Sequence, residues 1–162
     1  MGVTAGGNFI FNRTTGLIAL LKRFSTNAAI SWAALAAIAR HANTDVRVSF
    51  DGEPERPVRL SNLAVLKNPS ISGAMKASLR VSGDDGRLGV WMEEDLSRTA
   101  LLRLFLSLNS GRFSPNGTST IGAYRSLHVR GTNPFPVEFD GEILYAGDVE
   151  FSLLPGALEV CQ

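Results

Sequence analysis

The chain has 162 residues and a mass of 17.4 kDa, the size of one ordinary domain. Hydrophobic residues make up 44% of it and charged residues 19%, which allows a real core and argues against bulk disorder. The net charge of +1 argues against nucleic-acid binding. The single cysteine excludes an internal disulfide, and with only two histidines beside it a structural zinc site is not expected.

The first part of the chain predicts two helices after a connecting segment. Residues 1–14 are small, polar and Gly-rich, and we expect them to connect rather than to pack. Gly16 to Phe24 predicts one helix, closed by Lys22-Arg23. Ser25-Thr26-Asn27 offers N-cap side chains to a second helix that ends at Arg40-His41 and is apolar on most sides. Such a helix is usually covered on more than one side, and the alternative is a helix at a membrane interface.

No segment predicts export or a membrane span. The N-terminus lacks the basic start and the apolar stretch of a secretory signal. The most apolar run, Ala28 to Ala39, is interrupted by Ser31 and is shorter than the ~20 residues that span a bilayer. We therefore expect a cytoplasmic protein.

From Asp45 onward the hydrophobic period changes to two, which predicts strands. Strands are expected at Val46–Phe50, Val58–Leu66 and Leu88–Met92, and one further helix at Asp95–Leu108. A loop is expected from Arg112 to Ala123. Short alternating runs follow at Leu127/Val129, Val137/Phe139, Ile143–Tyr145, Val149–Leu153 and Leu158/Val160. The predicted fold class is α+β and mostly β, with N-terminal helices followed by an antiparallel β-sandwich-like domain with one further helix.

Standard catalytic and nucleotide-binding motifs are absent from the sequence, which has no G-x-S-x-G, Walker-type, HExxH, CxxC or GxGxxG pattern. Three weaker patterns remain. In the first, Ser82 to Gly86, the adjacent Asp84 and Asp85 could surround a hard cation with loop carbonyls. The alternative is an acidic turn before a strand.

The second pattern is Asp140-Gly141-Glu142, whose carboxylates could act on a hydroxyl proton as general base. Asp-Gly is also the commonest short hairpin signal, and Asp51-Gly52-Glu53 follows a predicted strand in the same manner. At least one of the two is therefore only a turn. The third pattern is the small-residue loop Ser70 to Lys76, which could approach a substrate or phosphate or simply connect two strands.

Taken in order, these patterns resemble a known family. The series runs V-R-V-x-x-D-G-E, N-P-S-I-S-G-A-M-K, D-D-G-R-L-G-V, L-S-R-T-A-L-L-R-L, N-P-F-P-V-E-F-D-G-E and L-L-P-G-A-L-E-V. It is similar to the C-terminal domain of bacterial lipid kinases of the diacylglycerol-kinase and sphingosine-kinase superfamily, over roughly residues 5 to 161. The resemblance implies a β-sandwich domain that faces a separate ATP-binding domain across the active-site cleft, where the γ-phosphoryl group passes to a lipid hydroxyl.

The resemblance also implies roles for individual residues. Asp140 would be the general base with Glu142 beside it, and Asp51-Gly52-Glu53 would be the turn. Asp84 and Asp85 would lie where the family holds a structural Mg²⁺. In the small-residue loop, the substrate-binding residues would be Ser72, Gly73 and Lys76.

Two departures from the family pattern matter. Arg87 and Gly89 stand in the loop that usually reads D-D-G-L-L-D, and the lost carboxylate weakens the metal assignment. The nucleotide motif is also missing, so residues 1–14 would be the crossover from an ATP-binding domain and residues 15–162 the substrate-side domain. Because phosphoryl transfer depends on positioning both substrates, we expect the chain alone to be inactive.

The leading interpretation is thus the C-terminal half of an ATP-dependent lipid kinase that acts on a diacylglycerol-like lipid. The alternative is a non-catalytic lipid-binding or oligomerisation module of the same fold. The expected partners are a lipid substrate, an N-terminal kinase domain or separate subunit, a transient membrane surface at the inner face of the membrane, and a possible second copy in a homodimer. Nucleic acid is not expected among them.

Overall fold

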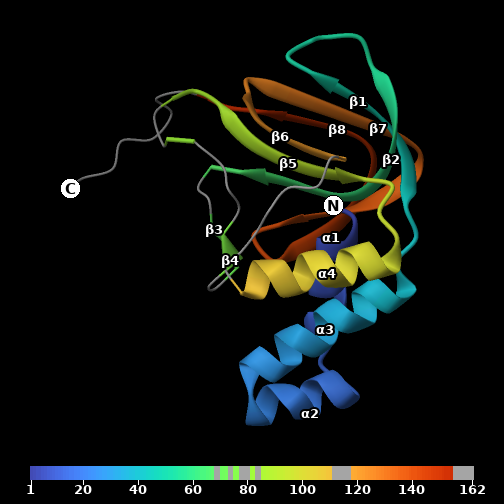
Figure 1. Cartoon of the computed structure of the whole chain (residues 1–162), viewed down its shortest axis with the longest axis vertical. Helices are drawn as coiled ribbons and strands as arrows, with labels where there is room; N and C mark the ends of the chain where they lie inside the picture. The colour runs from blue at the N-terminus through green and yellow to red at the C-terminus, as the bar shows by residue number, and fades with distance from the viewer. Residues whose placement is uncertain (68–69, 73–74, 77–80, 83–84, 111–117, 155–162) are drawn as a thin grey trace.

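The computed structural model in Figure 1 describes residues 1–67, 70–72, 75–76, 81–82, 85–110 and 118–154. These residues form four helices: α1 (Val3–Phe11), α2 (Leu17–Phe24), α3 (Thr26–Arg40) and α4 (Arg98–Asn109). Two of the helices begin at the serine caps that their sequences offer. The Ser25 hydroxyl accepts from the Ala28 amide at the start of α3, and the Ser97 hydroxyl accepts from the Ala100 amide at the start of α4.

The strands form one large sheet and one small hairpin. The sheet contains β1 (Thr44–Phe50), β2 (Arg56–Leu66), β5 (Leu88–Glu94), β6 (Ser119–Tyr124), β7 (Ser126–Phe139) and β8 (Glu142–Ser152). Its order is β6-β5-β2-β1-β7-β8 and every pairing is antiparallel. The hairpin pairs β3 (Ser70–Ser72) with β4 (Met75–Lys76). The predicted class, α+β with helices first and mostly strand after, is confirmed.

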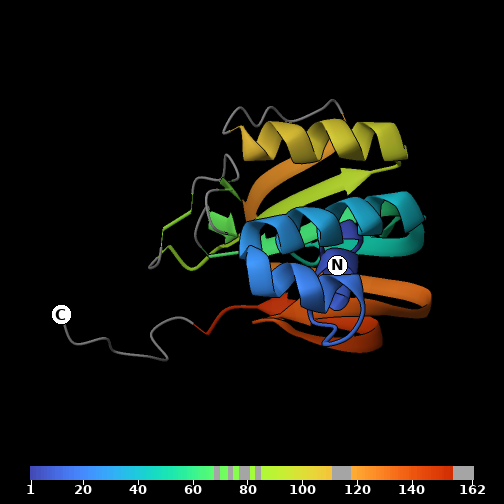
Figure 2. The same cartoon turned by 90° about the horizontal axis from the view of Figure 1, so that it is seen from below.

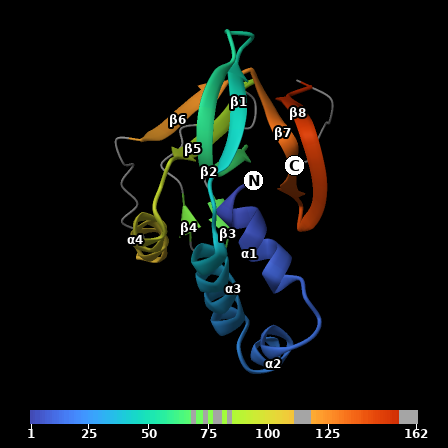
Figure 3. The same cartoon turned by 90° about the vertical axis from the view of Figure 1, so that its right-hand side faces the viewer.

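The helices gather at one end of the sheet. Figures 1 and 3 show α1, α3 and α4 below the strands, with α2 farthest from the sheet, and Figure 2 looks onto the helices from that end. None of the described helices is long and apolar enough to cross a membrane. The strand β5 lies between two apolar clusters because its residues alternate. Val90 and Met92 join the cluster of β1, β2 and β7, whereas Trp91 packs with Ile38 and α4.

The first fourteen residues differ from the prediction, since residues 3–11 are helical rather than a plain connection. The glycines of α1 are poor helix formers and hid the helix from propensity-based reasoning. Packing against α3 stabilises it: a side chain at Gly6 or Gly7 would reach Ala37 or Ala34 at 3.7 to 4.0 Å, so the small residues permit a close approach. Ala5, also on α1, is fully buried.

Two strand predictions also change. The expected loop from Arg112 to Ala123 contains most of β6, which pairs with β5 along its whole length. The short runs after Ser126 are parts of two long strands, because β7 continues through an irregular register between Arg130 and Phe135. The run Leu158/Val160 lies outside the described residues.

Candidate functional site

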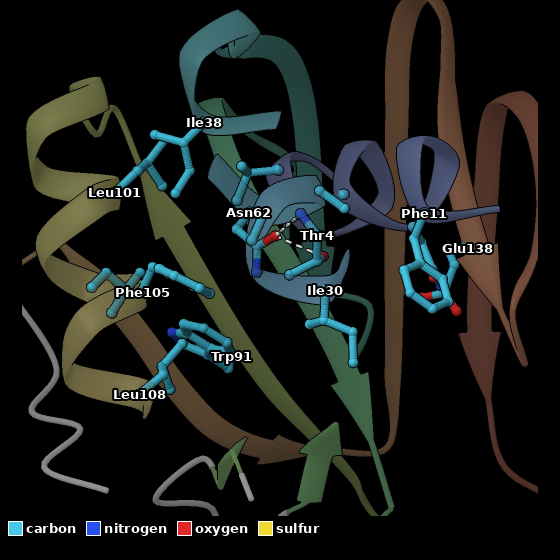
Figure 4. A pocket seen from close by; sticks show the side chains of 16 residues that line it. Thr4, Phe11, Ile30, Ile38, Asn62, Trp91, Leu101, Phe105, Leu108 and Glu138 are labelled. Carbon is cyan, nitrogen blue, oxygen red and sulfur yellow. Dashed lines mark hydrogen bonds between the residues drawn. The ribbon is translucent and has the colours of Figure 1, made fainter. Parts of the chain in front are cut away.

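A cavity of about 300 Å³ lies where α1, α3 and α4 meet the sheet. Most of its wall is apolar, and its larger apolar side chains are those of Val3, Phe11, Ile30, Ile38, Trp91, Leu101, Leu104, Phe105 and Leu108. Figure 4 shows these side chains converging from the three helices and from β5. A concave, mainly apolar cavity with few polar groups is typical of a small-molecule binding site.

Asn62 on β2 is the polar group in the middle of the cavity wall. It is 1% exposed, and its Oδ1 accepts from the Thr4 amide at 3.1 Å and from the Thr4 hydroxyl at 2.8 Å (Figure 4). Its Nδ2 has no hydrogen-bond partner within the described part of the chain. A buried amide without a partner costs about 1–3 kcal/mol, so Asn62 contributes an unsatisfied N–H donor to the wall of the cavity.

The local backbone places Asn62 there. The register of β2 against β5 shifts between Leu60 and Asn62, and Gly2 forms a bridge to Asn62. Gly2 has a φ of 72°, and a Cβ atom there would lie 2.3 Å from the Ser61 carbonyl oxygen. Only glycine therefore lets the start of α1 lie against β2, where Thr4 meets Asn62.

Trp91 forms the cavity wall beneath α4 and is held by a buried carboxylate. Its indole N–H donates to Glu93 Oε1 at 2.6 Å, and the Ser119 hydroxyl bonds both Glu93 oxygens at 2.7 and 2.8 Å. Glu93 is fully buried and Trp91 is 1% exposed. The network links β5 to β6 and fixes the orientation of the indole ring.

Glu138 on β7 supplies the one carboxylate that lines the cavity within the described residues. It accepts from the Gly141 amide at 3.0 Å, and the Asn12 side chain donates to the Gly141 carbonyl at 2.7 Å. The β7–β8 hairpin is therefore tied both to the rim of the cavity and to the end of α1. Asp140 and Glu142 are exposed on this hairpin, and neither is among the residues that line the cavity.

The two Asp-Gly patterns have the same backbone geometry. Asp51 and Gly52 have φ of 52° and 78°, and Asp140 and Gly141 have φ of 50° and 86°. The Asp51 carboxylate accepts from the amides of Arg125 and Ser126 at 2.6 and 2.9 Å, which confirms its part in a turn. Within the described residues no hydrogen bond or ion pair involves the Asp140 carboxylate, so its role as base stays a prediction.

Asp85 lies in the connection that leads into β5. Its Oδ1 accepts from the Lys67 ammonium at 2.5 Å and from the Arg87 amide at 2.9 Å, and its Oδ2 accepts from the Ser82 amide at 2.9 Å. These hydrogen bonds, that from Lys67 first, hold the pKa of Asp85 well below its usual value. Lys67 thus supplies a positive charge next to this carboxylate.

The assignment of Asp84 and Asp85 to a structural Mg²⁺ stays a prediction. No group of three or more His, Cys, Asp or Glu side chains that could hold a metal occurs among the described residues. Asp84 and Gly73 lie outside those residues. Ser72 and Lys76 lie in the β3–β4 hairpin, paired with Met75 and Ser70, and their proposed contact with substrate stays a prediction.

Sequence reasoning missed Asn62 and Glu138, although one signal was available. Asn62 interrupts the apolar run of β2, and a polar residue inside a buried strand is informative. Glu138 is flanked by the hydrophobic residues of a strand, so its position resembled an ordinary solvent-facing one. Which helices would close over these residues was not readable from the sequence.

Comparison with solved structures shows the same fold in bacterial proteins. A chain described as a putative diacylglycerol kinase from Bacillus anthracis str. Sterne is 18% identical, with a TM-score of 0.63 over 90% of this chain and 48% of that chain. A second chain with the same description and organism is 19% identical, with a TM-score of 0.57 over 76% of this chain and 42% of that chain. This chain thus spans about half the length of the solved chains that it matches.

A comparison with curated proteins found no match. The family described as the YegS C-terminal NAD kinase beta sandwich-like domain matches residues 2–162. This match agrees with the resemblance to C-terminal domains of diacylglycerol-kinase-like proteins that the ordered motifs indicate. The chain belongs to the family of the YegS C-terminal NAD kinase beta sandwich-like domain.

Proposed function

We propose that the chain is the lipid-binding domain of a diacylglycerol kinase-like phosphotransferase, and that the cavity between α1, α3 and α4 holds an acyl chain of its lipid. The observation that carries the proposal is an apolar cavity containing one buried amide donor without a partner, Asn62 Nδ2. Burial of an acyl chain gains about 0.8 kcal/mol for each methylene removed from water. An ester carbonyl or hydroxyl oxygen of the lipid would satisfy the Asn62 donor.

In the proposed reaction, the lipid hydroxyl gives its proton to the Asp140 carboxylate while its oxygen attacks the γ-phosphorus of ATP and ADP leaves. The β7–β8 hairpin supports this role, because Asp140 and Glu142 follow Glu138, which lines the cavity, by two and four residues. ATP would be held by a separate nucleotide-binding domain, with residues 1–14 as the crossover from it.

The binding step is tested with dihexanoylglycerol, a short-chain diacylglycerol used below its micelle concentration, by titration calorimetry. Asn62→Asp keeps an oxygen for Thr4 and replaces the amide donor by an acceptor, so we expect affinity to fall by about 10- to 100-fold. Thr4→Val is the matched control, because it removes the hydroxyl bond to Asn62 Oδ1 and leaves the free donor in place. Its affinity should change less than threefold.

Equal affinities of the wild type and Asn62→Asp would show that Asn62 does not bind the lipid. No binding by the wild type would overturn the lipid assignment of the cavity. Circular dichroism and the unfolding midpoint of each variant show whether it is folded. Hexane serves as a control ligand because it has no oxygen acceptor for the Asn62 donor. The wild type and Asn62→Leu should therefore bind hexane with the same affinity.

A non-catalytic lipid-binding module is the second candidate, favoured by the exposed position of Asp140 and by the ammonium of Lys67 on Asp85. This candidate predicts the same binding of dihexanoylglycerol. It predicts no phosphorylation of the lipid when ATP and a nucleotide-binding domain are supplied.

A further inference from the structure

One face of α2 is apolar and uncovered. Leu17, Leu20 and Phe24 are 50%, 50% and 81% exposed, and their spacing of three and four residues places them on one side of the helix. Ile18 is on the opposite side, 4% exposed, and packs with Ala29 and Ala33 of α3. The helix is therefore fixed to the domain by one side and presents the other to its surroundings.

The helical first part of the chain contains basic residues and no acidic ones. The first 44 residues contain four basic residues, Arg13, Lys22, Arg23 and Arg40, and no Asp or Glu, whereas residues 45–162 contain twelve basic and fifteen acidic residues. Within the described part of the chain, none of these four cations forms an ion pair with a carboxylate. Such a charge asymmetry between the parts of a chain is typical of proteins that bind a polyanion or an anionic membrane.

Basic and apolar groups occur together at this end of the molecule. The Lys22 ammonium lies 4.2 Å from the centre of the Phe11 ring and donates to the Arg13 carbonyl at 3.4 Å. Arg23 precedes Phe24 and is exposed on α2 itself. Figures 2 and 3 show that no other element covers the outer side of α2 in the described structure. Apolar side chains next to lysine and arginine are the signature of a helix that lies in the membrane interface.

We infer that the outer face of α2 docks on the surface of an anionic phospholipid bilayer, with Leu17, Leu20 and Phe24 inserted among the lipids and the basic residues at the headgroups. Eight residues of helix extend about 12 Å and cannot span the ~30 Å hydrocarbon core, so the helix lies on the membrane rather than across it. A second copy of the chain is a poorer occupant, because a two-fold contact would bring two acid-free, positively charged regions together.

This surface is separate from the lipid cavity and does not depend on the proposed function. The two are nevertheless close in the fold, because α3 packs against α2 and contributes Ile30 and Ala33 to the cavity wall. Docking through α2 would hold the cavity near the bilayer from which a lipid could enter.

The test is co-sedimentation of the purified chain with vesicles of phosphatidylglycerol and phosphatidylcholine, compared with phosphatidylcholine alone. We expect binding to the anionic vesicles, weakened by added salt. Leu20→Glu should lower the partition coefficient by about tenfold or more, and Arg23→Glu by about fivefold or more on anionic vesicles only. The matched control is Leu106→Glu, since Leu106 is 58% exposed on α4, and it should retain binding.

Tryptophan fluorescence gives a second readout. Trp32 on α3 is 43% exposed and Trp91 is 1% exposed, so a blue shift on addition of vesicles would come from Trp32 and be lost in Trp32→Phe. Equal loss of binding in Leu20→Glu and Leu106→Glu, or no binding at all, would overturn the inference. A dimer that Leu20→Glu disperses would assign the face to a second copy and would also overturn it. Unchanged binding of dihexanoylglycerol by Leu20→Glu shows that the cavity is intact, so the two proposals fail separately.

Discussion

At the scale of single residues, the two Asp-Gly turns separate a structural carboxylate from a free one. Both aspartates have left-handed backbone geometry, with φ of 52° at Asp51 and 50° at Asp140. Within the described residues, the Asp51 carboxylate accepts hydrogen bonds from the backbone amides of Arg125 and Ser126, and the Asp140 carboxylate accepts none. The sequence patterns are alike, so the difference arises from what the fold brings next to each turn.

This difference predicts unequal effects of alanine substitution on stability. Asp51→Ala and Asp140→Ala both lose about 1 kcal/mol, because alanine disfavours the left-handed conformation. Asp51→Ala also leaves two amides without their acceptor, so we expect its free energy of unfolding to fall by about 1–2 kcal/mol more than that of Asp140→Ala. Urea unfolding at pH 7 measures both values. Equal losses would mean that the Asp51 hydrogen bonds contribute nothing net.

At the scale of elements, the sequence predicted those whose hydrophobic period is strong. The alternation in Val46–Phe50 identified β1, and Ser25 identified the start of α3. The apolar face of Asp95–Leu108 identified α4, which begins at Arg98. The helix α1 was missed because its stability comes from close packing on α3 rather than from propensity. In the candidate site, Asp140 and Glu142 were chosen on motif. Asn62 had one local signal, as a polar residue inside an apolar strand, whereas the place of Glu138 at the cavity depends on tertiary packing.

The Lys67–Asp85 ion pair closes the long connection between β2 and β5. Lys67 directly follows β2, and Asp85 lies three residues before β5, so the pair joins the two ends of that connection. The hydrogen bonds from Lys67, Ser82 and Arg87 lower the pKa of Asp85 below the ordinary 3.8. The folded state therefore favours the ionised carboxylate, which stabilises the fold above about pH 4 and loses this effect as the pH falls through the folded-state pKa.

We accordingly expect Asp85→Asn to lower the urea midpoint at pH 7, and the difference from wild type to shrink as the pH is lowered below 3.8. Asp45→Asn is a suitable control, because Asp45 is 84% exposed and its contact with Arg59 is long, at 3.9 Å. Its midpoint should change little. A difference between Asp85→Asn and wild type that stays constant from pH 7 to pH 2 would rule out the ionised carboxylate as the source.

At the scale of the whole molecule, the near-neutral composition conceals a division of charge. The acid-free first 44 residues include α1, α2 and α3, and all fifteen acidic residues lie in the part of the chain that follows. The net charge of +1 is a sum over the whole chain, and it argues against a nucleic-acid partner only for the chain taken as a whole. The proposed membrane surface and lipid site rest on a basic helical end, an apolar cavity and a carboxylate-bearing hairpin beside that cavity.

The proposed reaction also depends on the whole molecule, because the sequence contains no nucleotide-binding motif. We expect the chain alone to give no phosphorylation of diacylglycerol with Mg-ATP, and the chain mixed with a nucleotide-binding domain to give measurable turnover. Asp140→Asn should then lower kcat by about 10²- to 10⁴-fold, the usual contribution of a general base. Asn retains the left-handed turn, so the loss would report on the proton acceptor.

Asp51→Asn is the matched control for this assay, since it makes the same substitution in a turn of the same geometry, and it should leave kcat unchanged. Glu138→Gln tests the carboxylate that lines the cavity separately from that of Asp140. If Asp140→Asn kept full turnover and Glu138→Gln lost it, the base would be the residue that lines the cavity and not the one at the turn. Turnover by the unmixed chain would instead contradict the division of the active site between two domains.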